Sequence, residues 1–241
     1  MSAAGKLEKL RSILSGAGSA VIALSGGTDS TFLLNVAAGV PGLRVMAVTV
    51  STPYMFSSEV DEAALFCREK GVPHRLVEFD IPDAVRENPP ERCYLCKTEV
   101  MKSVNAVAKE GGYAFVFDGT NADDLLDYRP GLKALEEAGV RSPLAEARLT
   151  KEEIRALARA AGLAVSDRPA NACLLTRFPH DTTISAANLR KAEKAEQLVR
   201  DEGFTGARVR VHGDIVRLEI RNEHFEHIAR QETRTRIASA L

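Results

Sequence analysis

Predominantly apolar runs alternate with segments of helical pattern in the first two thirds of the chain, and this alternation constrains the fold more than any other feature. The runs cover residues 19–24, 44–50, 74–79 and 114–117. Strands that are apolar at consecutive positions are buried on both faces, which is typical of a parallel sheet. The intervening segments 31–39 and 57–71 have the spacing of crossover helices. The pattern therefore predicts an α/β fold with a doubly wound parallel sheet.

A different pattern begins where this alternation stops. Prolines and polar residues gather in the segment 167–183, and a helix followed by two hairpin-like strands completes the sequence. Such clusters of proline and polar residues are typical of boundaries between domains. We therefore predict two domains, residues 1–165 and 166–241, of which the second is a small α+β domain.

The overall composition limits the partners of the chain. Lys and Arg total 32 against 33 Asp and Glu, so the net charge of −1 provides no field for a large polyanion, and a nucleic-acid partner is not expected. The N-terminal segment lacks the pattern of a signal peptide, and no apolar stretch is long enough to span a bilayer. We expect a soluble, cytoplasmic protein without a membrane partner.

A glycine loop follows the first predicted strand and opens a helix. Gly26 and Gly27 lack side chains, so their backbone N–H groups can approach an anion closely. Ser25, Thr28 and Ser30 add hydroxyl donors at the start of the helix, where anions bind favourably. The loop has no lysine of the Walker A type. It predicts a phosphate site, and the alternative is a glycine turn in which Ser30 is an ordinary helix N-cap.

Carboxylates close to this loop indicate a metal site. Asp29 lies inside the loop, where phosphate repels a carboxylate unless a metal or a hydrogen bond offsets the charge. Gly119, Asp123 and Asp124 follow the fourth predicted strand, at the edge where open α/β sheets bind ligands. We predict that Asp29 and one of Asp123 and Asp124 hold Mg²⁺ against phosphate. The alternative for the later segment is an Asx turn that caps the next helix.

Paired arginines mark one strand of the predicted second domain. Residues 208–212 alternate, so Arg208, Arg210 and His212 share one face of the strand. Two guanidinium groups on one face are suited to clamp a phosphate or a carboxylate through paired hydrogen bonds. We predict that Arg208 and Arg210 bind substrate, and the alternative is that their charges are only solvated.

One carboxylate falls on the apolar face of a predicted helix. Glu196 takes a position in the core spacing of Leu189, Ala192 and Val199. A buried carboxylate requires a partner or a raised pKa, and Arg177 on the preceding loop is the obvious partner. In the alternative, Glu196 lies at the helix edge and extends its carboxylate into solvent.

The four cysteines divide by their spacing. Cys67 has the spacing of a small core residue in the second predicted helix. Cys93 and Cys96 form a CxxC between the third strand and a helix, and Cys173 lies in the loop at the domain boundary. A CxxC alone is compatible with a redox dithiol, half of a zinc site or part of an iron–sulfur site.

The glycine loop reads SGGTDS, which resembles the SGGxDS signature of the PP-loop ATP pyrophosphatase superfamily. LarE-type sulfur transferases contain blocks similar to three later segments, GTNADDLLDYRPGLKALEEAGVRSPL, PANACLLTRFP and RVRVHGDIVRLEI. The resemblance implies that residues 1–165 bind ATP with Mg²⁺ and that residues 166–241 handle substrate and sulfur transfer.

The same resemblance implies the reaction and the partners. ATP is cleaved between its α and β phosphates, and AMP is attached to a carboxylate before sulfur attacks. The implied acceptor is a small nucleotide-like carboxylate, the pyridinium dicarboxylate mononucleotide of nickel-pincer cofactor synthesis. Sulfide or another sulfur donor is the second partner, and the family's habit predicts a homo-oligomer.

The resemblance also assigns roles to the cysteines. The best-known LarE-type enzymes keep only the cysteine that matches Cys173 and sacrifice its sulfur, so the CYLC segment departs from their pattern. Other PP-loop sulfur transferases hold a [4Fe–4S] cluster with three cysteines, which Cys93, Cys96 and Cys173 match. We favour this cluster, with one iron open to sulfide, and place Cys173, Glu196 and Arg177 at the catalytic site. Sacrifice of Cys173 and thiolation of tRNA are the alternatives.

Overall fold

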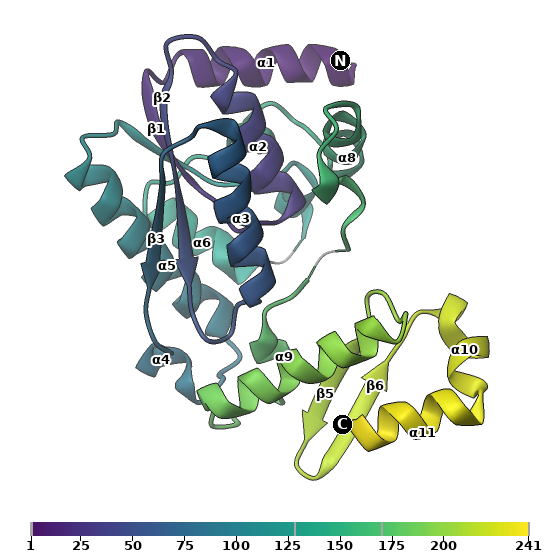
Figure 1. Cartoon of the computed structure of the whole chain (residues 1–241). Helices are drawn as coiled ribbons and strands as arrows, with labels where there is room; N and C mark the ends of the chain where they lie inside the picture. Colours follow the sequence, from purple (N-terminus) through teal and green to yellow (C-terminus); the bar gives the residue numbers. More distant parts are fainter. Residues whose placement is uncertain (1, 128, 170, 241) are drawn as a thin grey trace. The chain divides into compact units, whose positions relative to one another are not determined.

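The computed structural model of the chain has two compact units (Figure 1). The structure describes residues 2–127, 129–169 and 171–240. Tyr128 and Ala170 belong to two of the LarE-like segments but lie outside the described residues. Unit 1 consists of Met1–Thr52, Ser57–Pro82 and Glu91–Arg168. Unit 2 consists of Pro53–Phe56, Asp83–Pro90 and Pro169–Leu241. Unit 2 therefore includes two short segments from the first half of the chain.

The sheet of unit 1 consists of parallel strands. They are β1 (Ser19–Ala23), β2 (Arg44–Ser51), β3 (His74–Glu78) and β4 (Phe115–Phe117), in the order β3-β2-β1-β4. Each predicted strand is confirmed, with an end that differs by one residue from the prediction. Ile22 pairs with Ala47 on one side and with Phe117 on the other, so β1 is a central strand.

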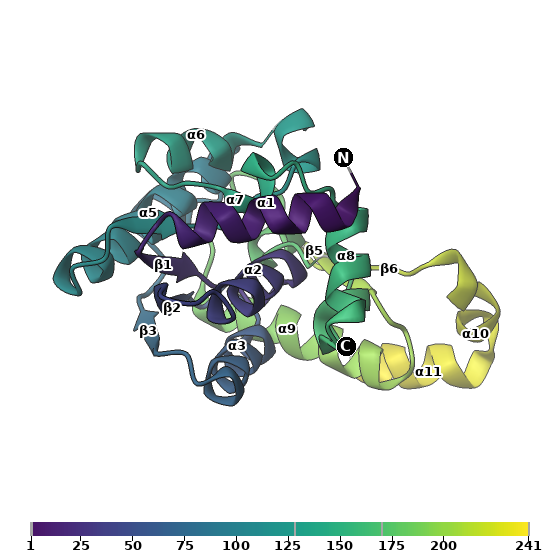
Figure 2. The ribbon, with the colours of Figure 1, turned by 90° about the horizontal axis from the view of Figure 1, so that it is seen from above.

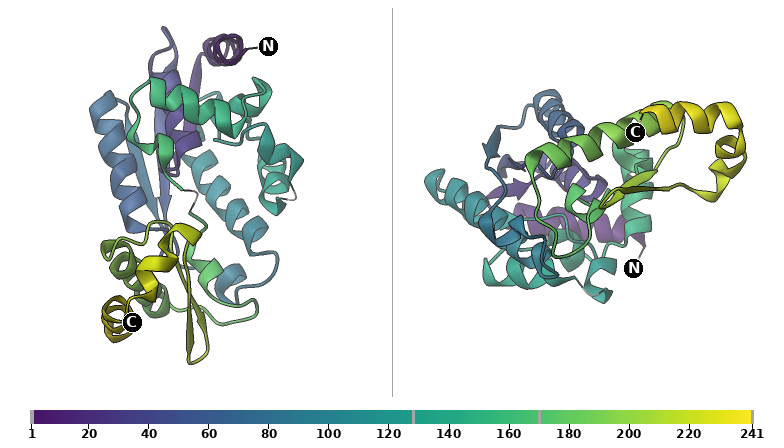
Figure 3. Two further views of the ribbon diagram at one scale, coloured as in Figure 1. Left: turned by 90° about the vertical axis from the view of Figure 1, so that its right-hand side faces the viewer. Right: turned by 90° about the horizontal axis from the view of Figure 1, so that it is seen from below.

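Helices cover both faces of this sheet. On one face, α2 (Thr28–Ala38) and α3 (Ser57–Lys70) lie side by side and pack on β1 and β2. On the other face, α5 (Arg92–Glu110) packs along β1, β2 and β4 (Figure 3). Burial on both faces explains why the central strand β1 is apolar at consecutive positions, whereas β3 at the edge of the sheet is largely exposed. The predicted α/β fold with a parallel sheet is confirmed.

The other helices of unit 1 surround this framework. They are α1 (Ala3–Ser15), α6 (Pro130–Glu137), α7 (Pro143–Glu146) and α8 (Lys151–Ala160), with 3₁₀ turns at Asp123–Leu126 and Ala164–Asp167. Helix α1 lies beside α2 and α7 (Figure 2), α8 packs on α2, and α6 packs on α5. Within the described residues, no helix combines the length and the apolar character that crossing a membrane requires.

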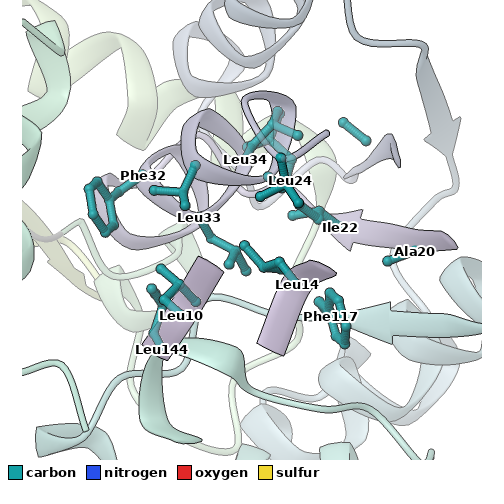
Figure 4. Packing of buried hydrophobic residues seen from close by; sticks show 14 of the residues in the cluster. Leu10, Leu14, Ala20, Ile22, Leu24, Phe32, Leu33, Leu34, Phe117 and Leu144 are labelled. Carbon is teal, nitrogen blue, oxygen red and sulfur yellow. The ribbon is translucent and has the colours of Figure 1, made fainter. Parts of the chain in front are cut away.

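The main core lies between the sheet and the helices α1 and α2. Leu10 and Leu14 of α1 meet Ile22 of β1 and Leu33 of α2 there (Figure 4). Cys67 of α3 belongs to the same core and is 1% exposed, which confirms its predicted place. Burial raises the pKa of the Cys67 thiol to about 11, so this thiol stays protonated and is not available for chemistry at neutral pH.

The order of the strands determines where a ligand can bind. Strands β2 and β3 lie on one side of β1, and β4 lies on the other, so the winding reverses between β1 and β4. Open α/β sheets bind ligands in the crevice at such a switch point, outside the carboxyl ends of the strands. The glycine loop follows β1, and the segment from Gly119 follows β4. The topology therefore brings two predicted site segments to one crevice.

Unit 2 has a smaller core of its own. Helix α9 (Ala186–Asp201) packs on an antiparallel hairpin of β5 (Arg208–His212) and β6 (Ile215–Glu219), as Figure 3 shows. The remaining elements are α4 (Asp83–Arg86), α10 (Phe225–Ala229), α11 (Gln231–Ala240) and the 3₁₀ turns Leu174–Arg177 and Asn222–His224. Val199, Phe204, Val209 and Ile237 form its buried centre. The helix and hairpin predicted for this part of the chain are both present.

Candidate active site

The backbone of the glycine loop explains why glycine is needed at its second position. Gly26 has a φ of 77°, a conformation that residues with a side chain rarely adopt. A Cβ atom at Gly26 would also lie 2.5 Å from the carbonyl oxygen of Glu59. The loop is therefore folded closely against α3, and only glycine permits this path.

Hydroxyl groups hold the loop in shape. The Oγ of Ser30 accepts from the N–H of Ser25 at 3.2 Å and lies 3.1 Å from the Ser25 hydroxyl. The hydroxyl of Thr28 donates to the carbonyl of Val165 at 2.7 Å. Helix α2 begins at Thr28, earlier than predicted, and its N-cap is Gly27, so the interpretation of Ser30 as an ordinary N-cap is wrong.

The start of α2 presents free N–H groups to a ligand. The N–H groups of residues 28–30 belong to the first turn, which has no acceptors within the helix, and no other described residue accepts from them. The positive end of the helix dipole lies at the same place. The crevice beside β1 therefore offers the donors and the partial charge that bind a phosphate.

Gly119, in the loop after β4, lies against the first turn of α2. A Cβ atom at Gly119 would lie 2.8 Å from the backbone nitrogen of Ser30, which is closer than real Cβ contacts come. The structure therefore brings two of the predicted site segments into direct contact. Any larger residue at position 119 would push the β4 loop away from the first turn of α2.

The acidic residues after Gly119 have internal partners. The side-chain oxygen of Asn121 accepts from the N–H groups of Asp123 and Asp124, which is the Asx turn that the sequence left as an alternative. Asp123 Oδ2 accepts from the N–H of Lys151 at 2.8 Å and so caps α8. Asp124 forms an ion pair with Arg129 at 2.8 Å. Both carboxylates therefore have partners of their own at this edge of the sheet.

Asp29 forms an ion pair with Lys151, a partner that was not predicted from the sequence. Its Oδ2 lies 2.6 Å from the ammonium of Lys151, the first residue of α8. Its Oδ1 is buried and has no hydrogen-bond partner among the described residues. Burial raises the pKa of the Asp29 carboxyl, and the Lys151 ammonium acts in the opposite direction without cancelling the shift. One carboxylate oxygen is therefore left for a cation.

One signal for Lys151 was present in the sequence. Thr150 and Glu153 form a capping box, which marks the start of a helix. A lysine in a first turn is electrostatically unfavourable, because the helix N-terminus carries positive partial charge. Such a lysine needs a carboxylate nearby, but the sequence did not show which carboxylate would supply it.

Arg168 also contacts the glycine loop and was not predicted. Its guanidinium donates to the carbonyl of Gly26 at 3.5 Å and forms an ion pair with Glu62. Together with the bond between Thr28 and Val165, this contact holds the end of unit 1 against the loop. The sequence places these residues far apart, so only the fold reveals the contact.

A buried ion pair organises unit 2. Arg177 and Glu196 are 1% and 2% exposed, and they share two bonds of 2.6 and 3.0 Å. Glu196 also accepts from the N–H of Val209 at 2.9 Å, and Arg177 donates to the carbonyl of Ala172. The alternative in which Glu196 reaches into solvent is therefore wrong. The pair connects α9, β5 and the backbone just before Cys173.

The two arginines of β5 differ in their surroundings. Arg210 donates to Glu219 at 2.8 Å and to the carbonyl of Thr176 at 2.7 Å. The guanidinium of Arg208 forms no hydrogen bond or ion pair with any described residue, and only its backbone pairs, with Glu219 of β6. Val209 between them is buried in the core of unit 2, as the alternation predicted. The guanidinium of Arg208 is therefore the one that stays available for a substrate.

The cysteines of the predicted cluster belong to different units. Cys93 is exposed and Cys96 is half-buried, and both lie within the first two turns of α5 in unit 1, so the expectation of a CxxC in the loop before the helix is wrong. They are three residues apart on a helix, which places them on one face. Cys173 is half-buried in unit 2. The described residues contain no group of three or more His, Cys, Asp or Glu arranged to hold a metal.

The parallel sheet, its switch point between β1 and β4 and the glycine loop without a Walker lysine define an α/β protein of the PP-loop class. Solved structures share this fold. The NMN synthetase of Francisella tularensis has a TM-score of 0.58 and 19% identity, over 70% of this chain and 76% of that one. The U34-tRNA thiolase NcsA of Methanococcus maripaludis, solved with its [4Fe–4S] cluster, has a TM-score of 0.53 and 21% identity, over 81% and 72%.

Relatives in sequence narrow the class to a family. No protein-family model matches the chain. An uncharacterized protein of Synechocystis sp. is 38% identical over 224 residues, which cover 92% of this chain and 83% of that protein. The pyridinium-3,5-bisthiocarboxylic acid mononucleotide synthase of Lactiplantibacillus plantarum is 38% identical over 202 residues, which cover 83% and 73%. The chain belongs to the family of this synthase, the LarE family of ATP-using sulfurtransferases.

The buried pair in unit 2 leads to a prediction about stability. Replacement of Arg177 by Met leaves the Glu196 carboxylate buried without its counter-charge, which lowers the free energy of unfolding by about 3–5 kcal/mol. Urea denaturation followed by circular dichroism measures the change. The control is Arg236→Met, because Arg236 pairs with Glu202 at the surface and should contribute about 0–1 kcal/mol. Equal losses in the two variants would contradict this role of the buried pair.

Proposed function

We propose that this protein adenylylates a substrate carboxylate with ATP, releases pyrophosphate, and then replaces AMP by sulfur. The observation that carries the proposal is the meeting of the loops that follow β1 and β4. Free N–H groups at the start of α2 meet there with a buried oxygen of Asp29 that lacks a partner. The name of the Lactiplantibacillus plantarum relative, a bisthiocarboxylic acid synthase, supports a carboxylate acceptor and a sulfur product.

The glycine loop is proposed to hold the phosphates that leave. Gly26, Gly27 and the backbone of residues 28–30 supply N–H donors, and Ser25 adds an exposed hydroxyl. The hydroxyl of Thr28 donates to the carbonyl of Val165 and that of Ser30 to the carbonyl of Gly27, so these residues contribute mainly by shaping the loop. Gly119 contributes by allowing the β4 loop to approach. Without a Walker lysine, the loop is suited to retain pyrophosphate after cleavage at the α phosphorus.

Residues of the crevice fit the Mg²⁺ that the family implies. The buried, unpartnered Oδ1 of Asp29 is the kind of hard oxygen that Mg²⁺ prefers. Asp123 lies at the same edge and is the proposed second carboxylate, although one of its oxygens caps α8. Bound Mg²⁺ supplies charge neutralisation for the phosphates. Asp29 positions that charge at the first turn of α2, beside the N–H donors.

The proposed reaction has two steps, adenylylation of the acceptor by ATP and displacement of AMP by hydrosulfide. A carboxylate oxygen of the acceptor attacks the α phosphorus of ATP, the bond from that phosphorus to the bridging oxygen breaks, and pyrophosphate leaves. A hydrosulfide sulfur then attacks the carbonyl carbon of the acyl adenylate, and AMP departs with the bonding electron pair. The product is a thiocarboxylate. The proposed acceptor is the pyridinium dicarboxylate mononucleotide of nickel-pincer cofactor synthesis.

The three-cysteine pattern is the basis on which we propose that Cys93, Cys96 and Cys173 hold a [4Fe–4S] cluster. Cys93 and Cys96 share one helix face, Cys173 is half-buried, and none of the three is sealed in a core as Cys67 is. The tRNA thiolase with this fold carries such a cluster, which supports the proposal. The cluster would supply an iron that takes up sulfur. Arg177 and Glu196 are proposed to hold the Cys173 backbone in place.

The proposed function predicts that ATP is cleaved between its α and β phosphates. Incubation with Mg·ATP and the acceptor should yield AMP and pyrophosphate, measured by ion-exchange chromatography. Asp29→Ala should slow their formation by at least about a hundredfold, because a metal contact contributes several kcal/mol to the transition state. Asp83→Ala is the control, since the side chain of Asp83 is 98% exposed. ADP and orthophosphate as products would show that the assignment is wrong.

The second prediction concerns the acceptor. Arg208→Ala should weaken binding of the pyridinium dicarboxylate mononucleotide by about 1.5–3 kcal/mol, the contribution of a hydrogen bond to a charged group. Affinity for ATP should stay unchanged, and calorimetric titration measures both. Arg217→Ala is the matched control, because Arg217 lies on the neighbouring strand and is paired with Glu219. If Arg208→Ala lowered the affinity for ATP and left acceptor binding intact, the assignment of Arg208 to the acceptor would be wrong.

The third prediction separates the cluster from sacrifice of a cysteine. Protein purified without oxygen should be brown and contain about four irons per chain. Replacing Cys93, Cys96 or Cys173 by Ser should remove the iron and sulfur transfer, while pyrophosphate release survives at least in part. Cys67→Ser should retain both. A loss of about 34 Da at Cys173 after one turnover, the mass of H₂S, would show sacrificial chemistry instead.

A further inference from the structure

Lys151 is held in an unusual place for a cation. It is the first residue of α8, where the helix dipole disfavours positive charge, and its own N–H donates to Asp123. Its ammonium nevertheless reaches the first turn of α2 and lies 2.6 Å from Asp29 Oδ2. One lysine thus contacts both acidic segments of the crevice.

The Asp29 carboxylate is only half satisfied by this contact. Oδ2 pairs with the ammonium, but Oδ1 is buried without a partner among the described residues. A buried carboxylate oxygen without a partner costs free energy, so the site favours the arrival of a second donor or a metal. The Lys151 side chain is 32% exposed, which leaves its flexible stem room to move.

We propose that Lys151 occupies the cation position on Asp29 before ATP binds, and that it gives up this position when the metal arrives with the nucleotide. This inference rests on the proposed function. A divalent metal on Asp29 would repel an ammonium 2.6 Å from the same carboxylate. The negative phosphates that arrive with the metal provide the ammonium with a new partner, and the three donors of lysine suit a phosphate.

The exchange has a consequence for the order of binding. Metal alone must compete with the ammonium for Asp29, whereas metal bound to ATP brings the phosphates that take over the ammonium. Before ATP binds, the Lys151 ammonium neutralises the Asp29 carboxylate and so weakens the binding of free divalent cations there. Lys151 is then a residue of the ATP site, and its ion pair with Asp29 is replaced by a contact with phosphate when ATP binds.

Titration with Mn²⁺ in the absence of nucleotide tests the exchange, with free Mn²⁺ measured by electron paramagnetic resonance. Lys151→Met should bind Mn²⁺ roughly tenfold more tightly than the unaltered protein, because the competing charge is gone. Its affinity for Mg·ATP should fall roughly tenfold, because the phosphates lose a partner. Lys151→Arg should keep Mn²⁺ binding weak, since the positive charge remains.

Lys6→Met is the matched control. Lys6 is also partly buried and forms a 2.7 Å ion pair with Glu153 of the same helix, but it does not contact Asp29. It should leave Mn²⁺ binding unchanged. Adding Asp29→Asn to Lys151→Met should abolish the gain, which ties the gain to that carboxylate. Circular dichroism confirms folding, and Lys151→Gln replaces the methionine variant if that variant fails to fold.

The outcomes separate the inference from the function on which it rests. If folded Lys151→Met binds Mn²⁺ no more tightly than the unaltered protein while that protein still forms pyrophosphate, the exchange is wrong and the function stands. If Mn²⁺ binding tightens but the unaltered protein forms no pyrophosphate, the exchange stands and the proposed function is wrong.

Discussion

The close approach of Gly119 to the first turn of α2 determines the geometry on which the nucleotide site depends. A Cβ atom there would lie 2.8 Å from the Ser30 nitrogen, so the contact requires a residue without a side chain. Through this contact, the loops after β1 and β4 meet at the point where the winding of the sheet reverses. The free N–H groups of α2, the Asp29 carboxylate and the cap of α8 are all arranged around it.

Two carboxylates of the chain, Glu196 and Asp29, show how hydrogen-bond partners decide between a structural and a chemical role. Glu196 accepts bonds from a guanidinium fork and from a backbone N–H, so its oxygens are saturated and it serves to connect elements of unit 2. Asp29 has one oxygen in an ion pair and one that is buried without a partner. A carboxylate with all its oxygens paired holds elements together and is costly to leave without its partner, whereas a half-satisfied carboxylate is available for a cation.

The cysteines show the limits of motif spacing. The CxxC was visible in the sequence, and so was the core spacing of Cys67, which the structure confirms at 1% exposure. The start of α5 ahead of Cys93 was not visible, because Glu91 at the N-cap makes no side-chain capping bond and the two prolines before it lie outside the helix. The helix places both thiols on one face, a feature that a loop would not guarantee.

The sequence by itself determined the sheet, the glycine loop and the hairpin of the second unit, because periodicity and glycine act through neighbouring residues. Only the tertiary structure decided which partners the charged residues take. Asp29 and Lys151 are separated by 122 positions, and Thr28 and Val165 by 137. Long-range pairs of this kind depend on how helices pack on the sheet, and local patterns do not encode that packing.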